Sequence, residues 1–150
     1  MILNRQRAVR LARRPLESFL RRVKNELGLD EASLTVCLVS DTEIARMNET
    51  FRKKKGPTDV LSFPMVARRR AVRLGRSSRT VKAGEYLGDI AISPATAQRY
   101  AKKYERKLSN ELQVLILHGV LHLLGYDHET DRGEMDRMER KLRKRLGLAR

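Results

Sequence analysis

The sequence predicts an α+β (mixed α/β) domain that combines a small sheet of about four strands with helices. Two observations point to this class. Short β-rich runs alternate along the chain with longer segments whose apolar residues recur at helical spacing. The 150 residues, 41% of them hydrophobic, are also enough for one domain with a core of its own. We therefore expect a single domain over residues 1–150, without internal repeats or linkers.

The first half of the chain predicts two helices and two strands. Residues 15–27 carry apolar side chains at helical spacing, with proline at the start and glycine directly after the end. Residues 34–39 form a short β-rich run. Ser40-Asp41-Thr42-Glu43 is a capping-box pattern that opens a helix through about residue 52. Residues 60–63 have the composition of a strand, which Pro64 stops.

The second half predicts one strand and three helices after a basic insert. Residues 67–82 combine seven Lys and Arg with glycine and serine, which indicates an exposed loop or ragged hairpin. A strand is expected over 87–92, and Ser93-Pro94 caps a helix that runs to about residue 106. A helix from about 109, ended by a glycine, is apolar enough to be the central buried helix. Residues 130–146 predict a surface helix that covers the core.

The charge balance points to a polyanionic partner. Lys and Arg number 33 against 18 Asp and Glu, which gives a formal net charge of +15. Because no apolar run approaches the roughly 20 residues of a membrane span and no signal segment is apparent, we expect a cytoplasmic protein that binds RNA or DNA rather than membrane. Aromatic residues make up only 5% of the chain, so a surface that stacks many bases is not expected.

The three histidines of the chain all lie in the run His118-Gly-Val-Leu-His122-Leu-Leu-Gly125-Tyr-Asp-His128. Positions i and i+4 of a helix share one face, so His118 and His122 could bind one ion. Gly125 permits a left-handed turn that returns the chain, and His128 could then complete the set. Three protein ligands with a fourth position for water are typical of catalytic Zn²⁺. The alternatives are core or surface histidines without a metal, and a purely structural metal.

Two neighbouring residues bear on the chemistry of this motif. The spacing also matches that of zinc peptidases of the metzincin type, in which a Glu general base directly follows the first His. Gly119 stands at that position, so peptide hydrolysis by the usual route loses its proton acceptor. Asp127 is either an acceptor behind the ligands, an extra ligand, or a solvated cap beside the turn.

The histidine run and two further stretches resemble the YbeY family of endoribonucleases, also called rRNA maturation factors. Met47-Asn-Glu-Thr-Phe-Arg52 and Pro57-Thr-Asp-Val-Leu-Ser-Phe-Pro64 are similar to the family's Asn, Arg and T-D-V-L-S-F-P segments. Leu87-Gly-Asp-Ile-Ala-Ile-Ser93 is similar to its G-D-I strand. The resemblance spans roughly Leu34 to the C-terminal helix.

The resemblance implies a zinc-dependent, single-strand-specific endoribonuclease. It would act in rRNA maturation, including processing of the 3′ end of 16S rRNA, and in ribosome quality control, with the ribosome or small-subunit proteins as further partners. It also implies a small mixed sheet flanked by helices, and one Zn²⁺ per chain on His118, His122 and His128. Near the metal it implies a cleft in which Arg52 matches the family's functional arginine. Arg52 and His118 are thus the expected catalytic residues, because a guanidinium can hold a phosphate and neutralise charge that develops on it.

The chain departs from the family pattern in two places. Lys53-Lys54-Lys55-Gly56 stands where many relatives would have an acidic residue, which puts a carboxylate role there in doubt. The basic insert 67–82 is either a local contact to RNA or the ribosome, or a solvated loop. We expect the RNA-binding residues to be Arg52, Lys53, Lys54, Arg68, Arg69 and Arg70.

The general base is left open by the sequence. Asp59 or Asp89 could lie near the cleft, although capping of a turn or strand end is the commoner role for each. Thr58 and Ser62 could touch substrate or simply build the cleft wall. Two other functions stay open: a non-catalytic RNA-binding ribosome-assembly factor with a structural metal, and another zinc-dependent hydrolase.

Overall fold

The computed structural model describes residues 1–65, 81, 83–127 and 131–148. Over these residues the chain forms a four-stranded sheet and five helices, which confirms the α+β class. In chain order the elements are β1 (Ile2–Asn4), α1 (Arg13–Glu26), β2 (Ser33–Leu38), α2 (Asp41–Arg52), β3 (Val60–Pro64), β4 (Tyr86–Ile92), α3 (Pro94–Lys103), α4 (Leu108–Leu123) and α5 (Glu134–Leu146).

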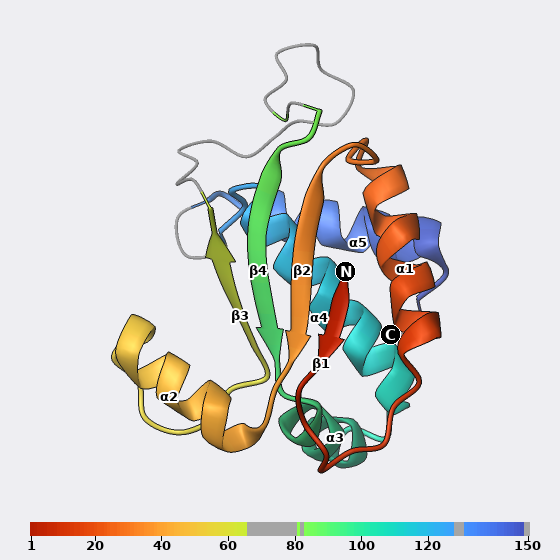
Figure 1. Ribbon diagram of the computed structural model, residues 1–150. Coiled ribbons are helices and arrows are strands. Elements are labelled where there is room, and N and C mark those ends of the chain that lie inside the picture. The colour runs from red at the N-terminus through yellow and green to blue at the C-terminus, as the bar shows by residue number, and fades with distance from the viewer. Residues whose placement is uncertain (66–80, 82, 128–130, 149–150) are drawn as a thin grey trace.

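The sheet has the strand order β1-β2-β4-β3 (Figure 1). β1, β2 and β4 are parallel, and β3 pairs antiparallel with β4. β3 is therefore an edge strand, and its register places Leu61 opposite Ala91 and Ser62 opposite Ile90. This mixed arrangement puts one side of β3 against the sheet and leaves the other side available to form a wall of a cleft.

Helices α1, α4 and α5 lie behind one face of the sheet, and α4 is the innermost of them (Figure 1). α4 contacts both the sheet and the outer helices, which explains why its apolar residues are not confined to one stripe. α2 covers part of the opposite face through a small cluster of Val39, Ile44, Leu61 and Ala91. None of the helices in the described ranges is both long and apolar enough to cross a bilayer.

Local capping signals in the sequence are confirmed. The Ser40 hydroxyl accepts a hydrogen bond from the Glu43 backbone N–H at the start of α2. Ser93 caps α3 in the same way through Thr96. Asp41 then joins the two helix starts, because its carboxylate accepts hydrogen bonds from the Ser93 and Thr96 hydroxyls at 2.6 and 2.7 Å and from Arg99 at 2.8 Å.

One strand and two helix boundaries differ from the sequence prediction. The strand Ile2–Asn4 was not predicted, because three residues carry too little periodicity. It pairs with β2, which follows it in the chain after α1. α3 ends at Lys103 rather than near residue 106, since Glu105 has a left-handed backbone with φ of 52°. α5 begins at Glu134 rather than at residue 130. The insert predicted over 67–82 lies outside the described residues, except for residue 81.

Candidate metal centre and cleft

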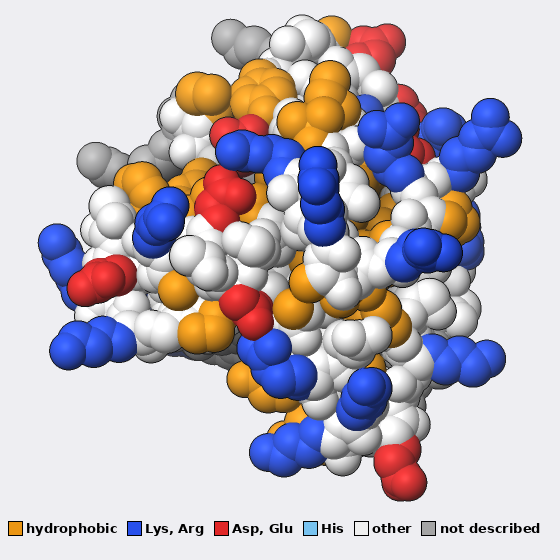
Figure 2. Space-filling model, turned by 60° about the horizontal axis from the view of Figure 1, so that its bottom comes forward, with side chains coloured by type: hydrophobic (Ala, Val, Ile, Leu, Met, Phe, Trp, Pro, Cys, Tyr) orange, Lys and Arg blue, Asp and Glu red, His pale blue; other side chains and the backbone are white. Residues whose placement is uncertain are grey.

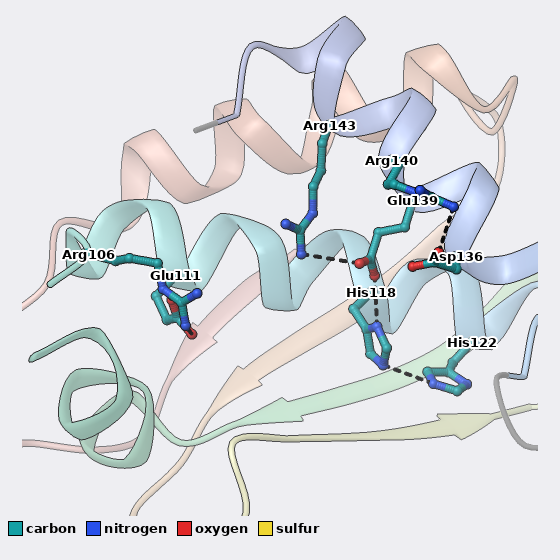
Figure 3. Close-up of polar contacts among 8 residues, drawn as sticks. All are labelled: Arg106, Glu111, His118, His122, Asp136, Glu139, Arg140 and Arg143. Carbon is teal, nitrogen blue, oxygen red and sulfur yellow. Dashed lines mark hydrogen bonds and ion pairs between the residues drawn. The ribbon is translucent and has the colours of Figure 1, made fainter. Parts of the chain in front are cut away.

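His118 and His122 occupy consecutive turns of α4 and point toward each other (Figure 3). Their Nε2 atoms are 3.1 Å apart, and the two rings meet edge to face with centroids 4.6 Å apart. Both side chains are half-buried. The predicted convergence of the i and i+4 imidazoles is therefore present.

The pair has the geometry expected of two ligands to one zinc ion. Nitrogen ligands lie about 2.0–2.1 Å from zinc, so a tetrahedral angle separates them by about 3.3 Å. The observed separation of the two Nε2 atoms, 3.1 Å, is close to this value. Within the described ranges no group of three or more His, Cys, Asp or Glu side chains forms a metal site, and the third predicted ligand, His128, lies outside those ranges.

Glu139 of α5 contacts the far side of the His118 ring (Figure 3). Its Oε1 lies 2.8 Å from Nδ1 of His118, and its Oε2 accepts a hydrogen bond from Arg143 at 3.2 Å. The Glu139 side chain is only 12% exposed. A carboxylate that accepts the Nδ1 proton keeps the lone pair of Nε2 available, which is the usual arrangement behind a metal-bound histidine. Sequence reasoning missed Glu139, because 21 residues and a turn separate it from His118.

The turn after α4 forms as the glycine predicted. Gly125 has φ of 101°, and its N–H donates to the His122 carbonyl while the Tyr126 N–H donates to the Leu121 carbonyl. These two bonds constitute a Schellman motif, which satisfies the last carbonyls of the helix. Beyond it the chain brings Asp127 into the cleft beside the histidine pair.

The cleft next to the histidines has a volume of about 760 Å³. Its walls come from the end of α2, the whole of β3, the end of α4 and the turn that follows. Arg52 lines the cleft together with His118 and His122, as predicted. The other lining residues are Phe51, Val60, Leu61, Ser62, Phe63, Pro64, Leu123, Gly125, Tyr126 and Asp127.

The other predicted RNA-binding residues are placed differently. Lys53 and Lys54 are exposed in the turn after α2 and do not line the cleft. This turn is held by Asn48, a buried residue of α2 whose amide donates to the Gly56 carbonyl at 3.0 Å. The three arginines of the basic insert, Arg68, Arg69 and Arg70, lie outside the described residues.

Gly119 of α4 packs against β4 and accepts a hydrogen bond from Ser62 of β3. A Cβ atom at Gly119 would lie 2.8 Å from Cγ2 of the fully buried Ile90, so α4 approaches β4 more closely than any larger residue permits. A glutamate at this position would face the sheet rather than the cleft. Ser62 donates its hydroxyl to the Gly119 carbonyl at 3.3 Å, which favours its interpretation as part of the cleft wall.

Neither of the two aspartates that the sequence left open as a general base lines the cleft, which favours a structural role for each. Asp89 precedes Ile90 on β4 and therefore faces away from α4, where it accepts a hydrogen bond from Tyr86. Asp59 contributes its carbonyl to the Ser93 N–H at the start of α3. Of the described residues that line the cleft, Asp127 is the one that carries a carboxylate.

Fold and site together define a class of α+β proteins in which a central helix presents a histidine pair to a cleft that an arginine also lines. The family model described as Endoribonuclease YbeY matches residues 1–147, which extends the resemblance back through β1. A relative named endoribonuclease YbeY from Solibacter usitatus is 41% identical over 144 residues, covering 95% of this chain and 86% of the relative. One from Aquifex aeolicus is 41% identical over 127 residues, covering 85% and 76%.

A solution structure of a protein from Thermotoga maritima has the same fold. It superposes with a TM-score of 0.63 at 26% identity, covering 97% of this chain and 89% of that one. The chain belongs to the endoribonuclease YbeY family, which by its name is a family of hydrolases that act on RNA.

Proposed function

We propose that this protein is a zinc-dependent endoribonuclease that cleaves single-stranded RNA during maturation of ribosomal RNA, including the 3′ end of 16S rRNA, and in ribosome quality control. The observation that carries the metal part of the proposal is the facing pair of Nε2 atoms in a cleft that Arg52 also lines. Family membership supports the RNA substrate.

His118, His122 and His128 would hold the ion. For His128 the support is its sequence position, directly after Asp127, which lines the same cleft. A bound zinc ion would supply a Lewis acid and lower the pKa of a coordinated water. Glu139 fixes the ring of His118 from behind, and Arg143 in turn holds the Glu139 carboxylate.

Arg52, which lines the cleft, would bind the phosphate that is attacked. Its guanidinium can donate two parallel hydrogen bonds to phosphate oxygens and stabilise the negative charge that builds on them. The attacking oxygen comes from water or from the 2′-hydroxyl of the substrate. Its new bond to phosphorus replaces one P–O ester bond of the strand, and the ribose oxygen that leaves takes up a proton from solvent. Asp127 is the candidate to accept the proton from that oxygen, because its carboxylate is the one among the described lining residues.

The surface outside the cleft favours a long polyanion over a small phosphoester. Lys and Arg side chains are spread over the end of the molecule that carries α2 and α3, with fewer acidic side chains between them (Figure 2). Such a distribution attracts RNA through its backbone and makes the affinity fall steeply with salt. We propose phosphate contacts for Lys53 and Lys54 and for Arg68, Arg69 and Arg70, with the ribosome or its small-subunit proteins as further partners in the cytoplasm.

The test combines metal content with RNA cleavage. Elemental analysis of purified protein should find close to one zinc per chain, and His118→Ala should reduce that content. Cleavage of a single-stranded RNA should stop on chelation and return with zinc. Arg52→Ala should lower cleavage strongly but keep the zinc. Arg46 is an exposed arginine of the same helix that does not line the cleft, so Arg46→Ala should keep both cleavage and zinc.

The outcomes separate the proposal from its rivals. Stoichiometric zinc without cleavage of any single-stranded RNA would support the non-catalytic assembly factor with a structural metal. Cleavage that persists in a metal-stripped His118→Ala protein would eliminate the metal mechanism. Zinc-dependent turnover of a small phosphoester but not of RNA would assign the protein to another class of zinc hydrolase.

A further inference from the structure

Phe51 is a large aromatic side chain that stays exposed beside the cleft. It is 66% exposed, although it precedes Arg52 at the end of α2 and lines the same cleft. The chain has only three Phe, four Tyr and no Trp, so few aromatic rings are available to contact a ligand in the cleft. Tyr100 and Tyr104 are exposed as well, but Phe51 is the exposed aromatic residue among the described residues that line the cleft.

The ring is held in a fixed orientation by a second aromatic residue. Phe63 of β3 meets Phe51 with ring centroids 5.1 Å apart and ring planes inclined by 71°, an edge-to-face contact. Phe63 is itself half-buried and packs on the small cluster beneath α2. α2 and β3 thus place one anchored ring and one exposed ring at the wall of the cleft.

Four cations directly follow Phe51 along the chain. Arg52 follows Phe51 into the cleft, and Lys53, Lys54 and Lys55 follow in an exposed turn that Asn48 holds against α2. Alternation of an exposed aromatic face with cations suits a nucleic acid strand, whose bases stack while its phosphates pair with the cations. An apolar protein surface would gain little from three consecutive lysines at this position.

We propose that Phe51, anchored by Phe63, is the stacking site for one unpaired nucleobase of the RNA strand that enters the cleft. This inference rests on the proposed RNA substrate. A base inside a duplex already stacks on its neighbours and turns its edge, not its face, to the protein. The site therefore takes only an unpaired base and contributes selectivity for single strands without reading sequence, since every base has a face that can stack.

Because the chain lacks tryptophan, Phe51→Trp introduces a single tryptophan, whose fluorescence can be excited selectively, at the site. A short unstructured RNA strand should quench this fluorescence saturably, while the same strand annealed to its complement should not at equal nucleotide concentration. The control is Tyr104→Trp, which replaces another exposed aromatic residue that lies at the end of α3 and does not line the cleft. Because Lys103 and Arg106 lie over the Tyr104 ring, any response of this control to RNA should be the same for the single strand and the duplex.

Affinity measurements distinguish stacking from simple apolar contact. Phe51→Leu keeps an apolar side chain but no aromatic face, and it should weaken single-strand binding about 5- to 150-fold, the range found when a stacking aromatic is removed. Binding of duplex RNA should not change. Phe51→Tyr should restore the wild-type affinity, and in cleavage assays the Leu variant should raise KM more than it lowers kcat, because stacking is also present before the transition state.

The results overturn or support the inference independently of the proposed function. If wild-type protein cleaves RNA and Phe51→Leu binds single strands as tightly as wild type, the stacking site is wrong while the nuclease proposal stands. Equal quenching of the Trp variant by duplex would also overturn it. If the strand quenches the Trp variant but wild-type protein never cleaves RNA, the stacking site stands and the catalytic proposal fails.

Discussion

Replacement of Glu139 probes the candidate metal centre without touching a ligand. The carboxylate accepts the Nδ1 proton of His118 at 2.8 Å and is clamped by Arg143 at 3.2 Å. The bond is largely shielded from water, because the side chains of His118 and Glu139 are 24% and 12% exposed. Loss of this acceptor would free the ring to rotate and to place its proton on Nε2, the atom that faces His122.

The expected effect on zinc affinity follows from the character of this bond. A hydrogen bond to a charged partner contributes about 1.5–3 kcal/mol, which is consistent with the about 10- to 100-fold loss of metal affinity on removal of such a carboxylate. We therefore expect Glu139→Ala to weaken zinc binding about 10- to 100-fold. Glu139→Gln keeps an acceptor but not the charge, and since neutral hydrogen bonds are about half as strong, it should cost about 3- to 10-fold.

Zinc affinity is best measured by competition with a chromophoric chelator, with the unfolding free energy of the metal-free protein measured separately. The matched control is Asp136→Asn on the same helix, an exposed carboxylate paired with Arg140 that should leave zinc affinity unchanged (Figure 3). Nitrogen NMR of the metal-free protein should find the Nδ1–H tautomer of His118 in the wild type and lose it in Glu139→Ala. Zinc affinity of Glu139→Ala within twofold of the control would refute this reasoning.

Three further predictions concern catalysis, packing and acid stability. Arg52→Ala should lower kcat for RNA cleavage about 10²- to 10³-fold, as for loss of a donor that stabilises transition-state charge, while Arg46→Ala should match wild type in the same assay. Gly119→Ala should destabilise the fold by about 1–3 kcal/mol in urea unfolding, because its methyl group would overlap buried Ile90, offset by at most about 1 kcal/mol of helix propensity. Burial tends to raise the pKa of Asp41, but hydrogen bonds from its three donors outweigh it and hold that pKa below the ordinary value of 3.8. The stability advantage of wild type over Asp41→Asn should therefore be complete above pH 3.8 and disappear as the pH falls through the lower pKa of the folded state. Urea unfolding at neutral and acidic pH measures this difference. An advantage that persists in acid would contradict the prediction.

Features that depend on neighbours within a few residues were predictable from the sequence alone. The spacing of His118 and His122 places both on one face of any helix, so their convergence needed no knowledge of the fold. The caps at Ser40 and Ser93 and the left-handed turn at Gly125 follow from the same local logic. The composition of the runs that became β2, β3 and β4 predicted strands there, whereas their parallel and antiparallel directions came from the tertiary structure.

Features that join distant segments appeared only in the tertiary structure. Glu139 reaches His118 because α5 packs on α4, and Phe51 meets Phe63 because α2 lies beside the edge strand. Asp89 does not line the cleft, because successive side chains of β4 alternate between the two faces of the sheet and Asp89 lies on the face opposite to α4. Periodicity and capping are set by the backbone over one or two turns, whereas strand order and helix layering decide which side chains share a site.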